Sequence, residues 1–218
     1  MNKDEMIKIK TWYFFYNCIL SKGTELLLEF QDFETKEDLK AIVQKHCPPS
    51  THGFSEIRGD SKRVQNNRVE FWKYLYEYCI ILQRKSPFYI SKSDFGGFGL
   101  FLKSDVKVES MQRKFDNYLF GYLCEVKEEV YNSLNKRAYP SLYKNNEICY
   151  VLCGGLALVN HSCGSQFYFT ANRTEYVYCK YKGEDSIYLK KDKELLVNYN
   201  SKFEFICICG KCTKKKQE

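Results

Sequence analysis

The sequence lacks any long apolar run: no stretch approaches the roughly 20 residues that a membrane-spanning helix needs. The segment Met1–Lys10 is charged and contains no apolar core of the kind found in secretory signal peptides. We find no internal repeat and no long low-complexity linker. These absences argue against membrane, secreted-scaffold and fibrous classes.

Alanine and arginine are also scarce. The chain has four alanines, and only seven of its 34 basic residues are arginines, whereas lysine, asparagine, tyrosine and phenylalanine are abundant. This bias is typical of codon drift in an AT-rich genome. The net charge of +7 is therefore weak evidence for a nucleic-acid partner, although it suits basic or chromatin-associated surroundings.

What remains is the composition of a folded chain. Its 218 residues are 44% hydrophobic and 28% charged, which is enough for one large domain or two small ones with a real core. Residues 1–86 have helical periodicity. A capping-box pattern at Thr35–Asp38 precedes an apolar stripe that ends at Pro48-Pro49. A second stripe, in a segment that starts near Arg63, consists of Val69, Trp72, Leu75, Tyr76, Cys79 and Ile80. A third helical segment, apolar on most sides, is expected around Trp12–Leu20.

From Phe88 onward the pattern changes to short runs that are typical of β-strands, separated by turns. We expect strands at Phe88–Ser91, Gly99–Leu102, Tyr118–Val126, Phe167–Thr170, Tyr176–Tyr181, Ser186–Leu189 and Glu194–Val197. Strands this short, with little helix between them, favour a compact β core over a parallel α/β sheet. The fold class is therefore α+β, helical first and β-rich afterwards.

Eleven cysteines are many for a chain without a secretion signal, and an odd number argues against a complete disulfide framework. Six isolated cysteines lie in apolar surroundings and are expected to pack as small hydrophobic residues: Cys18, Cys79, Cys124, Cys149, Cys153 and Cys179. Cys207, Cys209 and Cys212 are clustered and require another explanation.

Four segments contain residues suited to chemistry. A glycine-rich stretch, Gly96–Phe101, allows positive φ and close backbone approach to a ligand. Asn160–Cys163 places polar, titratable residues directly after an apolar run, although a lone histidine in a turn is the simpler interpretation. Glu194–Tyr199 is by itself an ordinary strand that ends in a tyrosine, and Cys207–Cys212 is a cysteine cluster.

The cysteine cluster predicts a zinc site. Cys209-Gly-Lys-Cys212 is a C-x2-C turn that directs two thiolates to one metal, and Cys207 adds a third. Structural zinc takes four ligands, and Cys163 is the natural fourth. His46, Cys47 and His52 could suggest a second metal site, but two adjacent ligands make a poor tetrahedral set and a polar loop is the better interpretation.

In this order, the four motifs resemble those of SET-domain protein lysine methyltransferases: Gly97-Phe98-Gly99, then Asn160–Cys163, then Glu194–Tyr199, then a post-SET cysteine cluster. The resemblance covers about residues 88–213. Leu119–Val126, Ser141–Tyr143 and Gly154–His161 give a finer match to the group that methylates lysine 20 of histone H4. The resemblance implies a helical domain at 1–86, a SET domain at 87–200, and a post-SET zinc segment with a basic tail at 201–218.

The resemblance also implies site residues. Tyr199 would be the catalytic tyrosine, and Tyr143, with Tyr122 as an alternative, would be a second tyrosine of the lysine channel. S-adenosylmethionine would be held by backbone groups around Gly97, Phe98 and Gly99, by the Asn160 side chain, by the His161 backbone, by Tyr199, and by Phe205 or Phe203 over the adenine. Zn²⁺ would be bound by Cys163, Cys207, Cys209 and Cys212.

The implied substrate is a lysine in a histone tail or another protein, with chromatin association, no membrane partner and a nuclear location, the cytoplasm remaining open. The family's N-H-S-C and E-L-x-x-x-Y segments cross as a pseudoknot.

Two alternative functions stay open. Gly164-Ser165-Gln166 replaces the usual x-P-N after N-H-S-C, which leaves room for a catalytically silent SET module that binds chromatin or a partner. The lysine surplus leaves room for a zinc-stabilised nucleic-acid-binding protein.

Overall fold

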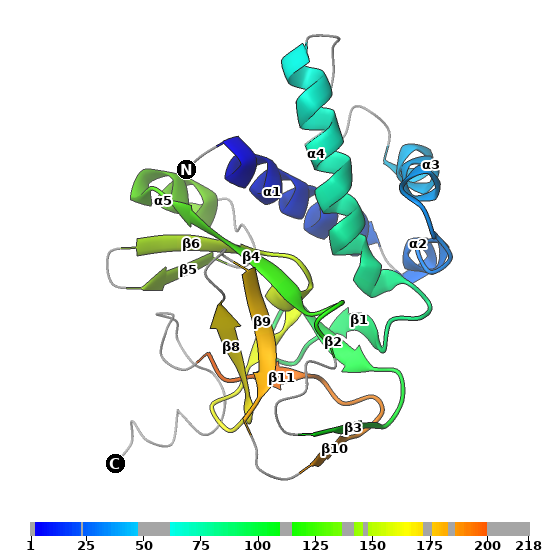
Figure 1. The fold of residues 1–218 in the computed structure, drawn as a ribbon, viewed down its shortest axis with the longest axis vertical. Helices are drawn as coiled ribbons and strands as arrows, with labels where there is room; N and C mark the ends of the chain where they lie inside the picture. The colour runs from blue at the N-terminus through cyan, green and yellow to red at the C-terminus, as the bar shows by residue number, and fades with distance from the viewer. Residues whose placement is uncertain are drawn as a thin grey trace. The chain divides into compact units, whose positions relative to one another are not determined.

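A computed structural model describes residues 3–22, 24–47, 62–109, 115–136, 142–145, 148–171, 176–182 and 186–199. The mixed fold expected from the sequence is confirmed: helices dominate the first part of the chain and short strands the second (Figure 1). The chain divides into two compact units, Met1–Ser86 with Ser133–Pro140, and Pro87–Asn132 with Ser141–Glu218.

The first unit is built from helices. They are α1 (Lys3–Phe14), a π-helical turn η1 (Phe15–Ile19), a 3-10 turn η2 (Leu20–Lys22), α2 (Thr24–Glu29), α3 (Lys36–His46), α4 (Lys62–Cys79) and a 3-10 turn η4 (Ile80–Leu82). The expected helix around Trp12–Leu20 is thus divided between α1, η1 and η2. Aromatic side chains fill the core between α1 and α4: the rings of Trp12 and Tyr78 meet edge-on at 5.6 Å, and both are fully buried.

The capping box that begins α3 is present as the sequence predicts. The Thr35 hydroxyl accepts from the Asp38 backbone N–H, and an Asp38 carboxylate oxygen accepts from the Thr35 N–H at 2.9 Å. Leu39 and Val43 follow on the buried face of the helix. The local sequence alone therefore fixes where this helix starts and which side faces the core.

The stripe of α4 departs from expectation most clearly at Val69. Trp72, Leu75 and Cys79 are buried as predicted, but Val69 is 65% exposed. Phe71 and Tyr78 belong to the buried face instead. The aromatic rings packed against α1 determine which side of α4 faces inward, and this tertiary preference is not visible in helical periodicity alone.

The second unit holds a five-stranded antiparallel sheet in the order β5-β6-β4-β9-β8. Its strands are β4 (Phe120–Val126), β5 (Leu142–Asn145), β6 (Ile148–Cys153), β8 (Phe167–Ala171) and β9 (Tyr176–Tyr181). Two antiparallel pairs accompany it, β1 (Phe88–Lys92) with β2 (Phe98–Leu102) and β3 (Val106–Val108) with β10 (Ile187–Leu189). The seven expected strands all occur, although the last is reduced to β11 (Leu196–Val197).

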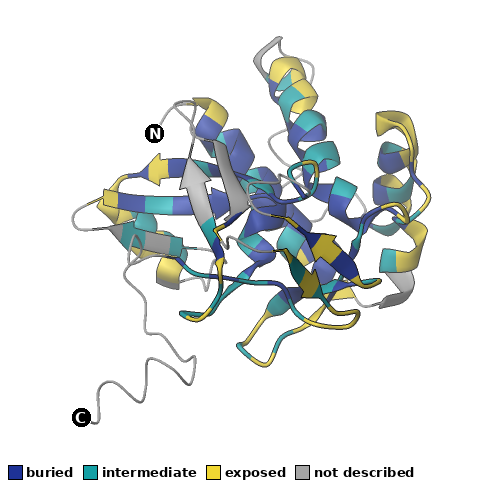
Figure 2. Cartoon of the chain, turned by 60° about the horizontal axis from the view of Figure 1, so that its bottom comes forward, coloured by how far each residue is buried: buried dark blue, intermediate teal, exposed yellow. Residues whose placement is uncertain are grey.

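Strands β3, β5 and β6 and helix α5 (Glu128–Lys136) were not expected from the sequence. The short 3-10 turn η5 (Gly155–Leu158) then leads from β6 to the two-residue strand β7 (Asn160–His161). In Figure 2, buried positions run through the strands and helices, and exposed positions lie on the outer sides of the helices and in the turns.

The isolated cysteines pack as predicted. Cys18, Cys79, Cys124, Cys149 and Cys153 are buried free thiols, while the side chain of Cys179 lies outside the described residues. Burial raises the pKa of Cys18 to about 11, so that its thiol stays protonated and unreactive at neutral pH.

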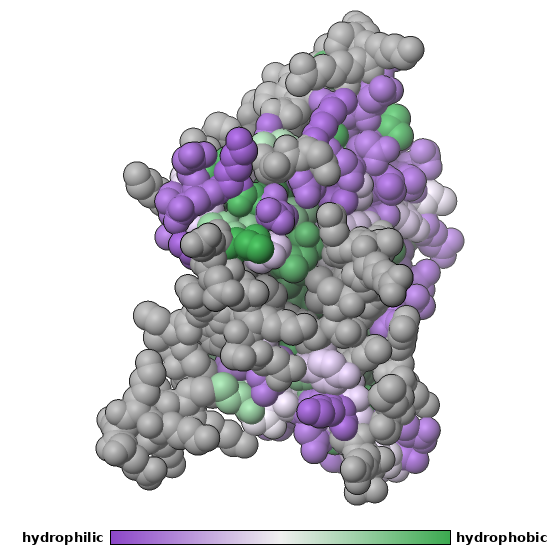
Figure 3. Space-filling model, turned by 60° about the vertical axis from the view of Figure 1, so that its left-hand side comes forward, coloured by the Kyte–Doolittle hydropathy of each residue, from purple (hydrophilic) through white to green (hydrophobic). Residues whose placement is uncertain are grey.

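Most of the coloured surface in Figure 3 is hydrophilic, with hydrophobic side chains confined to smaller areas. The exposed large hydrophobic residues are Leu28, Val69, Ile148 and Tyr188 among the described positions. No described helix is long and apolar enough to cross a bilayer.

Candidate functional site

Two distant segments of the chain meet in the second unit. Strand β7 pairs in parallel with β11, so that Asn160 lies opposite Leu196 and His161 opposite Val197. The Ser162 N–H extends the ladder by donating to the Val197 carbonyl at 3.0 Å. The N-H-S-C and E-L-x-x-x-Y motifs are therefore neighbours in space.

The glycine-rich motif joins the same place. Leu195 N–H donates to the Leu100 carbonyl at 2.7 Å, and Glu194 bridges to Phe101, which sets the segment before β11 against β2. Gly96 and Gly97 turn the chain with φ angles of 94° and 67°, the left-handed conformation that glycine permits, as predicted.

Asn160 is the residue that links the three motifs. Its side-chain Nδ2 donates to the Phe98 carbonyl at 3.2 Å and to Glu194 Oε1 at 2.7 Å. Gly99 makes room for this arrangement: a Cβ at position 99 would overlap with Glu194 Oε1 and come within 3.2 Å of Asn160 Nδ2. Three of the four predicted motifs thus converge on one half-buried amide.

His161 and Tyr199 pack against each other, with ring centroids 5.0 Å apart. The Tyr199 backbone N–H donates to His161 Nδ1 at 3.2 Å. Burial lowers the pKa of His161, in keeping with a neutral ring whose Nδ1 can accept. The ring proton then lies on Nε2, which faces Cys163 Sγ at 2.9 Å.

Tyr199 itself is almost completely enclosed. Its side chain is 7% exposed, and its hydroxyl donates to the Val159 carbonyl at 2.7 Å. Its catalytic role stays a prediction. Tyr122 is buried in β4. Tyr143 of β5 pairs through its backbone with Tyr150 of β6, and the Tyr143 side chain lies outside the described residues.

The residues near the carboxyl end that are predicted to bind zinc or to cover the adenine also lie outside the described part of the chain. They are Phe203, Phe205, Cys207, Cys209 and Cys212. Within the described ranges, no group of three or more His, Cys, Asp or Glu could hold a metal ion. Cys163 fits zinc by its donor type: its thiol is half-buried and free of a disulfide, and a His161 N–H beside a ligating sulfur would orient it.

The cofactor can be tested against the same residues. The ammonium of an amino-acid moiety needs hydrogen-bond acceptors. Asn160 Oδ1 has no partner among the described residues, since both hydrogen bonds of this side chain are donated by Nδ2. Oδ1 therefore fits the ammonium in the methionine portion of S-adenosylmethionine, whereas Nδ2 is already used by Phe98 and Glu194.

A cavity of about 340 Å³ lies beside these motifs. Ser162 and Glu194 contribute to its wall, as do Leu102 of β2 and Ile187 of β10, whereas Asn160 and Tyr199 do not line it.

Ser93 is a residue of the site that the sequence did not indicate. Its hydroxyl donates to Glu194 Oε2 at 2.9 Å and accepts from the Phe95 N–H. A serine in a turn carries no sequence signal for this contact.

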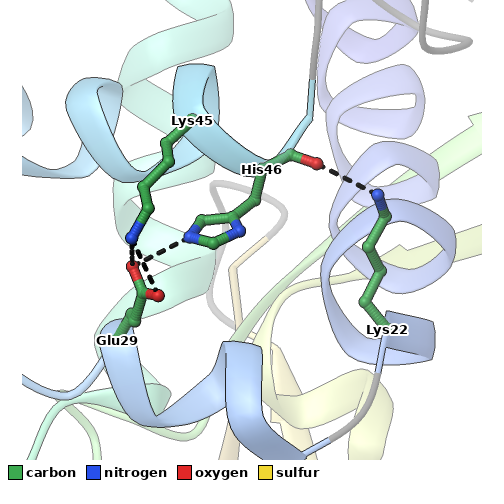
Figure 4. A network of polar contacts seen from close by, with 4 residues as sticks. All are labelled: Lys22, Glu29, Lys45 and His46. Atoms are coloured by element: carbon green, nitrogen blue, oxygen red, sulfur yellow. Dashed lines mark hydrogen bonds and ion pairs between the residues drawn. The ribbon is translucent and has the colours of Figure 1, made fainter.

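The second metal site weighed from the sequence does not form among the described residues. His46 Nε2 contacts Glu29 Oε2 at 2.8 Å, where Lys45 Nζ also binds, and Lys22 Nζ donates to the His46 carbonyl (Figure 4). Cys47 is buried and its thiol contacts the Cys18 carbonyl. His46 and Cys47 thus serve an ordinary polar network and the core, and His52 lies outside the described residues.

Comparison with known proteins adds little. No family model matches the chain, and no curated protein matches it. Among solved structures, the chain is similar to a Plasmodium falciparum protein described as a "putative histone methyltransferase", with a TM-score of 0.35 and 22% identity over 52% of this chain and 93% of that one.

Proposed function

We propose that this protein is an S-adenosylmethionine-dependent protein lysine methyltransferase, acting on a histone tail or another lysine-containing protein. The order of its motifs, which resembles the SET-domain pattern, suggests this function. The observation that carries the proposal is the Asn160 side chain, which binds Phe98 of one motif and Glu194 of another at 3.2 and 2.7 Å. Phe98 and Glu194 are more than 90 positions apart in the sequence, and the fold brings both to this one side chain.

In this proposal the chain mainly binds and orients. Asn160 Oδ1 would accept from the ammonium of the cofactor, and backbone groups near Phe98 and Gly99 would lie along it. When bound, S-adenosylmethionine supplies an electrophilic methyl group. The substrate amine has a pKa near 10.4 in water and must lose its proton, which a dry channel favours because desolvation lowers the pKa of a lysine. Orientation of the two reactants and exclusion of water from the channel supply much of the rate enhancement in such a reaction.

Zinc would hold the carboxyl-terminal tail. Cys163, half-buried beside His161, would be one ligand and Cys207, Cys209 and Cys212 the others. Structural zinc binds short peptides with on the order of 10 kcal/mol, which is ample to order a tail of this length. The pseudoknot crossing, a target in the histone H4 lysine 20 class, and a nuclear, chromatin-associated location belong to the same proposal.

The test uses Tyr199→Phe, with Tyr188→Phe as the matched control because Tyr188 is exposed on β10. Full-length protein is incubated with labelled cofactor and a histone mixture. An oriented hydroxyl at the reacting centre is worth about 10²-fold or more in rate, so Tyr199→Phe should lose at least that factor and the control nothing. Equal rates of methyl transfer by wild type and Tyr199→Phe would show that the Tyr199 hydroxyl has no catalytic role.

A second candidate is a catalytically silent SET module that binds chromatin or a protein partner. The observation that favours it is the Tyr199 hydroxyl, which is bonded to the Val159 carbonyl at 2.7 Å, while Tyr199 does not line the cavity beside the motifs. Calorimetric titration discriminates the two. Zinc-loaded protein that binds no S-adenosylmethionine would support the silent module, and saturable binding would support the enzyme.

A further inference from the structure

A half-buried polar network surrounds Asn160 in the second unit. Ser93 Oγ donates to Glu194 Oε2 at 2.9 Å, and Glu194 Oε1 accepts from Asn160 Nδ2 at 2.7 Å. The same Nδ2 donates to the Phe98 carbonyl. The network joins the turn after β1, the β7 strand and the segment before β11.

The neighbours of Asn160 determine which way its amide points. The Phe98 carbonyl can only accept a hydrogen bond, and an ionised Glu194 carboxylate can also only accept. The NH₂ group must therefore face both of them, and Oδ1 must face away. Turning the amide over would set its oxygen against two acceptors, so the two contacts themselves fix the orientation of the amide.

Glu194 is the stronger of the two acceptors. No basic side chain within ion-pairing distance neutralises it in the ranges that the structure describes. A charged acceptor in a half-buried place makes a shorter and stronger bond than a carbonyl does, in line with 2.7 Å against 3.2 Å to Phe98. Gly99 leaves space for the carboxylate there, since a Cβ would lie 2.8 Å from Glu194 Cδ.

We propose that Glu194 is a positioning residue that acts through Asn160: its carboxylate holds the amide so that Oδ1 is presented as an acceptor to the ammonium of the cofactor. The inference rests on the proposed function, because it names what Asn160 needs in order to bind S-adenosylmethionine. Ser93 supports the arrangement by fixing the second carboxylate oxygen. Glu194 itself makes no contact with the reacting atoms in this account.

The experiment compares Glu194→Ala, which removes the acceptor, with Glu194→Gln, whose amide oxygen still accepts from Asn160. Glu125→Gln is the matched control, because Glu125 is an exposed carboxylate on β4. Two quantities are measured on full-length protein. Nuclear magnetic resonance gives the hydrogen-exchange rate of the Asn160 side-chain amide without cofactor, and calorimetry gives the dissociation constant of S-adenosylmethionine.

Loss of a hydrogen bond to a charged group corresponds to about a 10- to 100-fold change in an equilibrium. Glu194→Ala should raise the exchange rate by at least about tenfold and weaken cofactor binding by a similar factor. Glu194→Gln should fall between Glu194→Ala and wild type in both quantities, and Glu125→Gln should match wild type. The partial rescue by glutamine distinguishes a positioning role from attraction of the ammonium by charge alone.

The inference is overturned if Glu194→Ala binds the cofactor as tightly as wild type, whatever its exchange rate. It is also overturned if Glu194→Gln binds as weakly as Glu194→Ala, because the hydrogen bond would then not be the cause. Wild-type protein that binds no cofactor overturns the proposed function, and the inference with it. Binding by wild type that Glu194→Ala leaves unchanged overturns the inference alone.

Discussion

Gly99 shows how one missing side chain shapes the site. Its position is buried, and the Glu194 carboxylate occupies the space in which a Cβ would stand. The approach of a ligand to this glycine-rich segment stays a prediction, and in the structure Gly99 also admits a carboxylate of the protein itself. Its partner is 95 positions away, and no local pattern indicates such a contact.

Gly99→Ala should therefore destabilise the protein by about 1–3 kcal/mol, the usual cost of overpacking. Urea unfolding measures the free energy. In a Glu194→Ala background the same substitution should cost much less, because the colliding carboxylate is gone. Equal costs in the two backgrounds would mean that Gly99 and Glu194 do not compete for this space.

Asp4 and Tyr74 give a pH-dependent contact in the first unit. Partial burial alone would raise the pKa of Asp4, but hydrogen bonds from the Tyr74 hydroxyl, at 2.6 Å, and from Lys8 outweigh it and leave the pKa lowered. A carboxyl with a lowered folded-state pKa contributes stability above its unfolded pKa, near 3.9, and loses it as the pH falls through the folded value.

The free energy of unfolding of wild-type protein should thus fall relative to that of Asp4→Asn as the pH is lowered from about 5 to about 3, the range in which carboxyl groups take up protons. The urea midpoint at each pH measures this loss. Asp94→Asn, at an exposed position, is the control and should keep the pH dependence of wild type. Parallel curves for wild type and Asp4→Asn would contradict the assignment.

At the scale of an element, α3 is encoded locally. Thr35→Ala removes the hydroxyl that accepts from the Asp38 N–H at 3.1 Å, and loss of such a cap should cost about 1 kcal/mol. Urea unfolding followed by circular dichroism measures the loss. Thr35→Ser keeps the hydroxyl and should retain most of the stability, so that an equal loss in both variants would show that the cap is not its source.

The elements also show what sequence can predict here. The start of α3 and strands such as β1 and β2 follow from local patterns, since caps and alternation act within a few residues. The inward side of α4 does not, because Phe71 and Tyr78 are selected by rings on α1. Within the site, the motifs indicated Asn160, but its bond to Glu194 and the contribution of Ser93 depend on tertiary packing.

At the scale of the whole molecule, zinc removal should impair the function of the second unit and leave the helices of the first unit folded. Chelation should abolish methyl transfer, because the tail carrying Cys207, Cys209 and Cys212 would lose its anchor at Cys163, and far-ultraviolet circular dichroism should keep most of its helical signal. The helical signal is expected to remain because the helices of the first unit have an aromatic core of their own around Trp12.

Metal analysis by mass spectrometry supplies the control for that result. Cys163→Ser should lower the zinc content, while Cys124→Ser, at a buried position in β4, should leave it unchanged. Wild-type protein purified without any zinc, yet active, would contradict the zinc anchor.

The central claim is that the site around Asn160 transfers a methyl group to a protein lysine. Mass spectrometry of a histone mixture incubated with the full-length protein and S-adenosylmethionine tests it most directly. We expect new methyl-lysine at a defined position, and we expect Asn160→Ala to abolish it. Unmodified histones, after incubation with protein shown to bind both zinc and the cofactor, would contradict it.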